Sequence, residues 1–104
     1  MADVPTLQMN TGEQIPQLGF GVFQIDPAET REATLAAIEV GYRHIDTAQM
    51  YRNERGVGEA VRDSGLDRSE VFITTKLNNN SHDPEVVPDA FDRSLRELAM
   101  DHVD

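Results

Sequence analysis

Three side chains that could together donate a proton lie between positions 46 and 76 of this chain. Asp46 closes an apolar stretch, Tyr51 follows in a segment typical of a loop, and Lys76 ends the run V-F-I-T-T-K. A tyrosine in water has a pKa of about 10 and is a poor acid at neutral pH. A neighbouring ammonium favours the phenolate, and a carboxylate paired with that ammonium keeps it charged and in place. These residue types therefore suit proton donation to a developing alkoxide.

Each of the three residues also has a purely structural interpretation. An aspartate after a strand most often caps the next helix. A lysine at a strand end is commonly a solvated charge on the sheet edge, and a loop tyrosine usually contributes packing. Each residue alone is a weak indication of chemistry. Their joint placement at the ends of neighbouring elements is the observation that favours a catalytic interpretation.

The composition excludes several other classes of function. The 104 residues hold 19 acidic against 9 basic side chains, a formal charge of −10, so nucleic acids and anionic membranes are not expected as partners. There is no cysteine and the histidines lack metal-ligand spacing, so no disulfide and no metal site is predicted. The opening M-A-D-V-P-T lacks the basic and apolar segments of a signal peptide, and no apolar run is long enough to span a membrane. A cytoplasmic location is therefore expected.

Turn and cap residues divide the chain into alternating strands and helices. Apolar and polar residues alternate on both sides of the turn N-T-G at 10–12, which predicts a β-hairpin. Asp26 followed by Pro27 is typical of a helix N-terminus, and Gly41 of a helix end. After the hairpin, the predicted order is a strand at 18–25, a helix at 26–41, a strand at 42–46, a helix at 53–62, a strand at 71–76, a helix at 84–100 and the approach to a further strand at 101–104.

The helical spacing of apolar residues indicates which faces should pack on a core. Glu54, at the start of the second helix, is interpreted as a charge that complements the helix dipole. The residues expected to face the core are Leu35, Ile38 and in part Ala36 in the first helix, Val57, Ala60 and Val61 in the second, and Val87, Phe91, Leu95 and Leu98 in the third.

Strict alternation of strands and helices implies parallel strands joined by right-handed crossovers. The 30 residues that separate Asp46 from Lys76 match one βα unit of an eightfold barrel. A doubly wound sheet is the competing architecture, but neither G-x-G pair, at 19–21 and 56–58, shows the phosphate-binding glycine pattern between a strand and a helix. We therefore predict an α/β fold of the (β/α)8 TIM-barrel type, of which the chain supplies the N-terminal hairpin and about three βα units.

That fold would bring the candidate residues to one rim. Neighbouring parallel strands end side by side about 4.8 Å apart, a distance that a lysine stem spans. The carboxyl end of the strands is also where active sites lie in this architecture. We expect Asp46 and Lys76 to pair there, with Tyr51 leaning over them from its loop.

Residues 41–58, G-Y-R-H-I-D-T-A-Q-M-Y-R-N-E-R-G-V-G, resemble the first signature of the aldo-keto reductases. The shared pattern is a glycine, an aromatic residue, an arginine, a variable and an apolar residue, then D-T-A, five residues, a glutamate, two residues, an apolar residue and a glycine. Every fixed position matches. The hairpin start, the run L-G-F-G-V-F at 18–23 and I-T-T-K-L at 73–77 are also similar to this family, and to its bacterial diketogluconate-reductase branch in particular. The resemblance covers the whole chain.

This resemblance implies a barrel plugged at its bottom by the hairpin, with a nicotinamide cofactor, usually NADPH, across the upper rim. It implies reduction of an aldehyde or ketone to an alcohol by hydride transfer from NADPH. Tyr51 would be the general acid, Lys76 would make it a stronger acid, and Asp46 would pair with Lys76 and contact the nicotinamide ribose.

The same resemblance extends to the residues around the cofactor. Gly21, Val22 and Phe23 would line the cofactor, and Phe23 and Tyr51 would contact the carbonyl substrate. Asn78 stands where many members carry a tryptophan, so the identity of the carbonyl substrate does not follow from the resemblance.

The family's fourth catalytic residue, a histidine at the end of the fourth strand, has no counterpart, because the chain ends at Asp104. Residues 1–104 are accordingly expected to be the N-terminal part of a single barrel domain and to be inactive alone. The alternative is a non-catalytic barrel fragment that acts as a self-associating or interaction unit. In both cases, Val22, Ile45 or their neighbours, and Ile73 are expected on an open face that self-association or the missing C-terminal part would cover.

Overall fold

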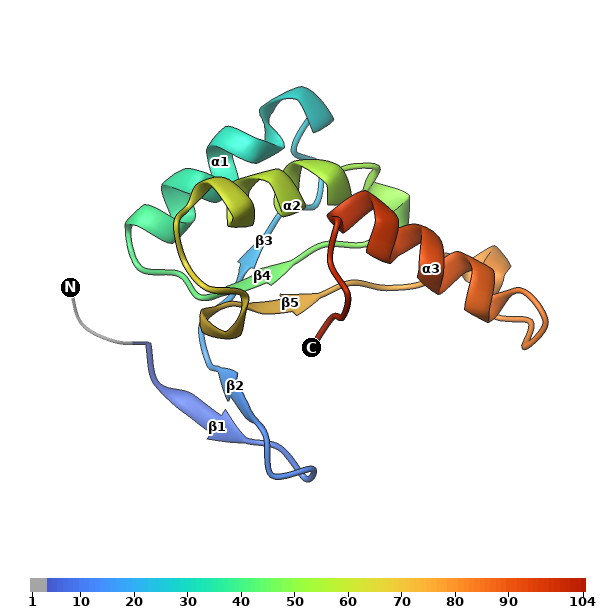
Figure 1. The fold of residues 1–104 in the computed structure, drawn as a ribbon, viewed down its shortest axis with the longest axis horizontal. Coiled ribbons are helices and arrows are strands. Elements are labelled where there is room, and N and C mark those ends of the chain that lie inside the picture. The colour runs from blue at the N-terminus through green and yellow to red at the C-terminus, as the bar shows by residue number, and fades with distance from the viewer. Residues whose placement is uncertain (1–3) are drawn as a thin grey trace.

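The computed structural model describes residues 4–104, so positions 1–3, part of the opening run M-A-D-V-P-T that is not expected to form a signal peptide, lie outside the described residues. A small parallel sheet is covered on one face by three helices, and a two-stranded hairpin projects on the side away from those helices (Figure 1). The order of hairpin, strand, helix, strand, helix, strand and helix is the predicted one.

The hairpin consists of β1 (Thr6–Gln8) and β2 (Gln14–Pro16), which pair antiparallel with Leu7 opposite Ile15. Gly12 in the turn has a φ of +93°, a left-handed conformation that a side chain would strain. The turn therefore depends on the glycine that predicted it.

The sheet consists of β3 (Phe20–Gly21), β4 (His44–Asp46) and β5 (Phe72–Thr74), parallel and in that order. Each strand is shorter than predicted, and Lys76, expected as the last residue of its strand, comes two residues after the end of β5. Parallel strands joined by helices are the arrangement expected of consecutive βα units.

The expectation that Ile73, with Val22 and Ile45 or their neighbours, lies on the open face is wrong for the three named residues. All three side chains are fully buried beneath the helices, where they form the centre of the core. The helices that join consecutive parallel strands pack on one face of the sheet, and these three residues point to that face rather than to the open one.

The opposite face of the sheet carries a small aromatic and polar cluster instead. The ring of His44 lies 4.9 Å from that of Phe72, and its Nε2 is 2.9 Å from the Thr74 hydroxyl. Gly19 lies against the same ring, since an added Cβ would come within 3.1 Å of His44 Nδ1. This face is half-buried rather than open and apolar.

Helix α1 (Pro27–Glu39) begins as predicted, because the Asp26 carboxylate accepts a hydrogen bond from the Ala28 amide. Its C-terminal end is held by Arg43, whose Nη1 donates to the Ile38 carbonyl. Ala36 is exposed, which corrects its predicted place on the core face. The buried residues of this helix are Thr30, Thr34, Ala37 and Ile38.

Helix α2 (Glu54–Asp63) lies between its neighbours α1 and α3 (Val87–Leu98) (Figure 1). It contacts both of them at glycine residues. A Cβ built on Gly58 would lie 2.1 Å from the Leu98 carbonyl oxygen, and one on Gly56 would lie 2.9 Å from a side-chain carbon of α1. The two glycines therefore set how closely the three helices approach one another.

Helix α3 differs from its prediction at both its start and its exposed face. It begins at Val87 rather than at Pro84, because the preceding residues form a turn. Phe91, expected in the core, is 39% exposed, while Ala90, Ser94 and Leu98 form the buried face. Within residues 4–104, no helix has the length and apolar character needed to cross a membrane.

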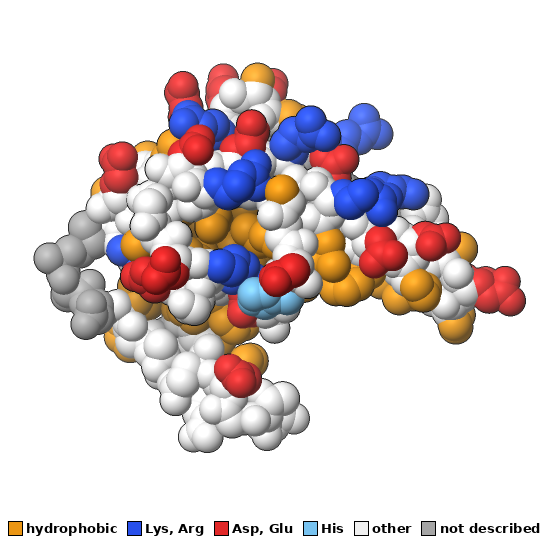
Figure 2. Space-filling model, in the orientation of Figure 1, with side chains coloured by type: hydrophobic (Ala, Val, Ile, Leu, Met, Phe, Trp, Pro, Cys, Tyr) orange, Lys and Arg blue, Asp and Glu red, His pale blue; other side chains and the backbone are white. Residues whose placement is uncertain are grey.

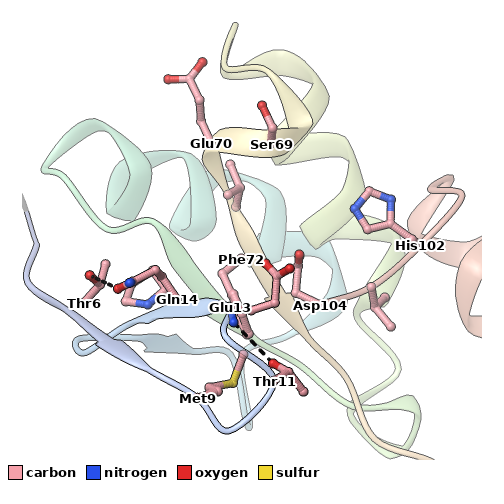
Figure 3. Close-up of a pocket in the computed structure, with 13 residues that line it drawn as sticks. Thr6, Met9, Thr11, Glu13, Gln14, Ser69, Glu70, Phe72, His102 and Asp104 are labelled. Atoms are coloured by element: carbon pink, nitrogen blue, oxygen red, sulfur yellow. Dashed lines mark hydrogen bonds between the residues drawn. The ribbon is translucent and has the colours of Figure 1, made fainter.

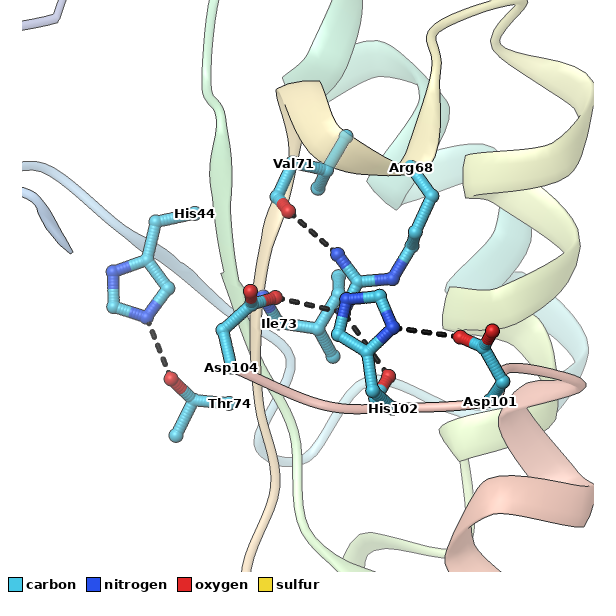
Figure 4. A network of polar contacts seen from close by, with 8 residues as sticks. All are labelled: His44, Arg68, Val71, Ile73, Thr74, Asp101, His102 and Asp104. Carbon is cyan, nitrogen blue, oxygen red and sulfur yellow. Dashed lines mark hydrogen bonds and ion pairs between the residues drawn. The ribbon is translucent and has the colours of Figure 1, made fainter. Parts of the chain in front are cut away.

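The last residues of the chain run beside β5, as expected for the approach to a further strand (Figure 4). The Asp104 amide donates to the Ile73 carbonyl at 2.9 Å, and the Asp104 carboxylate accepts from the Ile73 amide. Arg68 fixes this segment, since its guanidinium donates to the Asp104 carboxylate at 2.7 Å and to the His102 carbonyl at 3.1 Å. Asp104 therefore hydrogen-bonds to the edge of β5, where a further strand of the sheet would pair.

Candidate active site

The structure brings Asp46, Tyr51 and Lys76 together at the carboxyl end of the sheet. Asp46 is the last residue of β4, and Tyr51 is the last residue of a 3-10 turn, η1 (Gln49–Tyr51). The Lys76 ammonium forms an ion pair with the Asp46 carboxylate and lies 3.4 Å from the Tyr51 phenol oxygen, toward which it donates. It also donates to the Thr47 carbonyl at 3.0 Å. The ammonium therefore stands between a carboxylate and a phenol, as the sequence predicts.

This group of side chains is open to solvent rather than buried. The side chain of Asp46 is 39% exposed and that of Lys76 is 47% exposed. An approaching molecule can therefore reach the rim directly.

The charges around Lys76 keep its ammonium protonated. Burial lowers the pKa of Lys76, but hydrogen bonds to Asp46 and Tyr51 and the charges of these groups outweigh burial, so the pKa is raised above its ordinary value of 10.5. A charged ammonium at this position can stabilise negative charge that develops on the neighbouring phenol oxygen during a reaction.

Backbone hydrogen bonds beyond the strands hold the rim in place. The Thr47 amide donates to the Thr74 carbonyl at 2.8 Å, and the Gln49 amide donates to the Lys76 carbonyl at 3.2 Å. The 3-10 turn then ends at Arg52, which adopts a left-handed conformation with a φ of 59°. The segment that carries the tyrosine therefore runs directly beside the segment that carries the lysine.

Asn53 is a functional residue that reasoning from the sequence missed. It is 1% exposed, and its side-chain amide donates to the carbonyls of Val22 at 2.9 Å and Ile25 at 3.3 Å. Its oxygen accepts a hydrogen bond from the Thr47 hydroxyl at 2.8 Å. Asn53 thus ties the segment after β3 to the end of β4. In the 41–58 run, Asn53 is one of the five residues before the glutamate that the pattern leaves unspecified, so the run carried no signal for it.

Glu54 does more than complement the helix dipole. Although it is the first residue of α2, its side chain is turned inward and the residue is only 6% exposed. Its carboxylate accepts a hydrogen bond from the Thr75 hydroxyl at 2.7 Å. Glu54 therefore anchors the residue that precedes Lys76.

The residues predicted to line a cofactor differ in how accessible they are to an approaching ligand. Phe23 is 61% exposed and its ring lies 5.1 Å from the ring of Tyr51. A Cβ built on Gly21 meets no atom within 4 Å, so a flat ligand can approach the backbone there. Val22 is buried, its amide donates to the Asp46 carbonyl and its carbonyl accepts from Asn53. Gly21 and Phe23 thus leave an open surface beside the tyrosine, which fits a planar nicotinamide.

A cavity of about 700 Å³ lies at the other end of the sheet (Figure 3). Residues of the hairpin, the residues that precede β5 and the last residues of the chain line it, Phe72, Glu13 and Asp104 among them. The amino ends of the strands point toward it, and hydrophobic side chains are visible in the hollow between hairpin and helices (Figure 2). This cavity is therefore separate from the rim that holds Tyr51.

Comparison with known proteins agrees with the arrangement of fold and rim. The model of the Aldo/keto reductase family matches residues 17–104, and the chain belongs to this family. A solved aldo/keto reductase from Brucella melitensis is 49% identical, with a TM-score of 0.96 over 100% of this chain and 40% of its own. A Bombyx mori aldo-keto reductase in complex with NADP is 37% identical, with a TM-score of 0.94 over 100% of this chain and 37% of its own. The predicted fold class, a part of a (β/α)8 barrel, is confirmed.

The curated relatives are also matched over only part of their own length. Glycerol 2-dehydrogenase (NADP(+)) of Saccharomyces cerevisiae is 52% identical over 94% of this chain and 31% of its own length. Morphine 6-dehydrogenase of Pseudomonas putida is 49% identical over 96% of this chain and 34% of its own length. The chain thus spans about a third of the curated relatives that it matches.

Proposed function

We propose that the protein containing these residues reduces an aldehyde or ketone to an alcohol, with NADPH as the hydride donor and Tyr51 as the proton donor. The observation that carries this proposal is the contact of one ammonium, that of Lys76, with both the Asp46 carboxylate and the Tyr51 phenol oxygen. A barrel segment that only supports a fold has no need for an ammonium held against a phenol.

The three side chains have distinct roles in the proposed reaction. NADPH, when bound, supplies a hydride to the carbonyl carbon. The Tyr51 hydroxyl gives its proton to the carbonyl oxygen as negative charge develops there. Lys76 stabilises the phenolate that is left, because its Nζ already donates toward that oxygen. Asp46 keeps the ammonium charged and in position.

The proposed cofactor contacts come from the residues beside this rim. Gly21 and Phe23 offer the open surface, Asp46 offers a carboxylate that can accept from a ribose hydroxyl, and Val22 contributes by holding its exposed neighbours in place. The choice of NADPH is supported by the NADP in the Bombyx mori structure and by the NADP(+) in the name of the yeast relative. The substrate carbonyl would lie against the exposed side of Phe23 and Tyr51, whose rings pack on each other with centroids 5.1 Å apart.

We further propose that residues 1–104 are the N-terminal part of a single barrel domain. The coverage of 40% of the Brucella melitensis chain supports this proposal. The later strands of such a barrel would cover the edge of β5 and the face that carries His44 and Phe72. In an isolated polypeptide, the same surfaces favour self-association or pairing with the C-terminal part.

The substrate class and the branch of the family are also proposals. Two of the relatives are named glycerol 2-dehydrogenase and D/L-glyceraldehyde reductase, which supports small hydroxy-ketones and hydroxy-aldehydes as a first class to assay. The runs at 18–23 and 73–77 support a place in the bacterial diketogluconate-reductase-like branch. Relative turnover of glyceraldehyde and of a diketogluconate would decide between these classes.

A cytoplasmic location is proposed on the NADPH chemistry, since NADP is the cofactor named for the Bombyx mori structure and the yeast relative. Fractionation of the producing cells, with the protein followed by antibody, is the measurement. Recovery in a membrane or secreted fraction would contradict the proposal.

The central test of the proposed function is Tyr51→Phe in the full-length protein, in which residues 1–104 are joined to the rest of the barrel. This change removes only the phenol hydroxyl, so the ring contact with Phe23 is kept. We expect the kcat of aldehyde reduction to fall by about 10²-fold or more, while NADPH binding, measured by fluorescence titration, is retained. Turnover close to that of the unchanged protein would exclude Tyr51 as the acid.

A further inference from the structure

Gln49 connects the tyrosine and lysine segments of the rim through three hydrogen bonds. Its backbone amide donates to the Lys76 carbonyl at 3.2 Å. Its side-chain oxygen accepts from the Asn78 amide at 3.1 Å, and its side-chain nitrogen donates to the Ala90 carbonyl at 2.6 Å. One residue therefore holds the loop on both sides of position 77 and fastens that loop to α3.

The position of Gln49 in the 3-10 turn gives these bonds a consequence for the proton donor. Gln49 is the first residue of η1 and Tyr51 is the last, and the Arg52 amide donates back to the Gln49 carbonyl to close the turn. A displacement of the Gln49 side chain therefore moves the turn that carries Tyr51. The same displacement frees the loop at Asn78, so only the backbone bond from the Gln49 amide to the Lys76 carbonyl still joins the two segments at this point.

The contact between donor and ammonium is sensitive to such a displacement. Lys76 Nζ is 3.4 Å from the Tyr51 phenol oxygen, near the upper limit for a hydrogen bond. A further separation of about 1 Å would break it, and misplacement on that scale costs an enzyme up to about 10²-fold in rate. Asp46 cannot prevent the separation, because its ion pair fixes Lys76 to β4 and not to the turn.

We propose that Gln49 is a positioning residue that sets the distance between the Tyr51 phenol and the Lys76 ammonium. The inference rests on the proposed reductase function and adds a residue that touches neither the substrate nor the cofactor. Gln49 acts through the two segments it joins, with the backbone of α3 as its fixed support.

The test compares two variants of the full-length protein. Gln49→Met keeps the length of the side chain and deletes both polar groups. Arg55→Met is the matched control, because it deletes an exposed tether between α2 and α3, the Arg55–Glu97 ion pair, without touching the lysine loop. Aldehyde reduction is measured across pH together with KM, melting temperature and NADPH affinity.

For Gln49→Met we expect the kcat to fall by about 10-fold or more, with the KM and NADPH affinity within about twofold of the unchanged protein. The pH above which reduction declines should move upward, because the phenol gives up its proton less readily without the ammonium beside it. Arg55→Met should keep both the kcat and the pH profile. Should Gln49→Met fail to fold, Gln49→Asn replaces it, since its amide is one methylene too short to reach either partner and predicts the same losses.

The outcomes separate this inference from the proposed function. A normal kcat and pH profile in the Gln49 variant that folds, with Tyr51→Phe inactive, would overturn the positioning role and leave the reductase function in place. Full turnover in Tyr51→Phe would overturn the function itself. A lowered melting temperature in the Gln49 variant with an unchanged pH profile would show a structural role only and would also overturn the inference.

Discussion

At the scale of single residues, the chemistry of this chain depends on one ammonium with two anionic or potentially anionic neighbours. Lys76 pairs with Asp46 and donates toward Tyr51, and these contacts raise its pKa against the opposing effect of burial. A positive charge held in this way would stabilise the phenolate that the proposed proton donation leaves behind. The same contacts make the rim sensitive to loss of that charge.

Lys76→Met is the direct test of this electrostatic role, because it keeps the stem and deletes the charge. In the full-length protein we expect a lower kcat and an upward shift of the pH above which reduction declines, since the phenol loses its cationic neighbour. A pH profile of reduction identical to that of the unchanged protein would contradict the role.

The same variant has a second readout in stability. The folded pKa of Lys76 is raised above 10.5, so its ion pair contributes stability below that pH and loses it as the pH rises through the folded value. Lys76→Met should therefore flatten the decline of stability in the alkaline range, measured by urea unfolding at several pH values. Both side chains of the pair are more than a third exposed, so solvent screens the effect and the change should be modest.

The three catalytic candidates could be predicted from the sequence because each follows or ends a recognisable element within a long, specific run. Asn53 and Glu54 lie in the same run, but their roles were missed. Both act through side chains turned into the interior, toward the Val22 carbonyl and the Thr75 hydroxyl. Neither partner is close in the sequence, so spacing alone could not reveal them.

At the scale of elements, close packing of the helices is set by residues without side chains. Gly58 leaves room for the carbonyl of Leu98, so α2 and α3 approach more closely than any other residue would allow. The sequence placed Gly58 in a helix but gave no reason for it, since a glycine inside a helix is unfavourable by itself. The reason is the contact between the helices.

Gly58→Ala is expected to destabilise the full-length protein by about 3 kcal/mol, in spite of the better helix propensity of alanine. The added Cβ would lie 2.1 Å from a backbone oxygen, which cannot move as a side-chain end could. Urea unfolding is the measurement. Gly21→Ala serves as the stability control, because its Cβ would meet no atom within 4 Å. Equal stability of the two variants would show that α3 yields easily and that the contact is unimportant.

Element boundaries could be predicted where local chemistry sets them and not where tertiary packing does. The start of α1 was correct because Asp26 caps it within the chain itself. The start of α3 was placed too early, since a turn precedes Val87 and no side chain caps this helix. The helical spacing predicted Phe91 in the core, yet Phe91 is exposed and the smaller residues Ala90 and Ser94 are buried instead.

At the scale of the whole molecule, helices fully cover one face of the sheet, while the other face is only partly covered. Helices bury Val22, Ile45 and Ile73 completely, whereas the opposite face is only half-buried and opens on the cavity beside the hairpin. Each 100 Å² of apolar surface left open withholds about 2.5 kcal/mol of stabilisation. The stabilisation withheld by a few such areas therefore equals the net free energy of unfolding of a typical domain, about 5–15 kcal/mol.

The isolated polypeptide of residues 1–104 is therefore expected to self-associate and to lack reductase turnover. Its hairpin cavity and the half-buried face around His44 and Phe72 would be covered by a second copy or by the remaining barrel segments. Light scattering of the purified polypeptide should show oligomers, and NADPH oxidation with a reactive aldehyde should stay at the background rate. Addition of the C-terminal part of the barrel as a separate chain should restore both a defined mass and turnover. A monodisperse monomer of 11.6 kDa that turns over at the rate of the full-length protein would show that three strands with Asp46, Tyr51 and Lys76 suffice for the reaction.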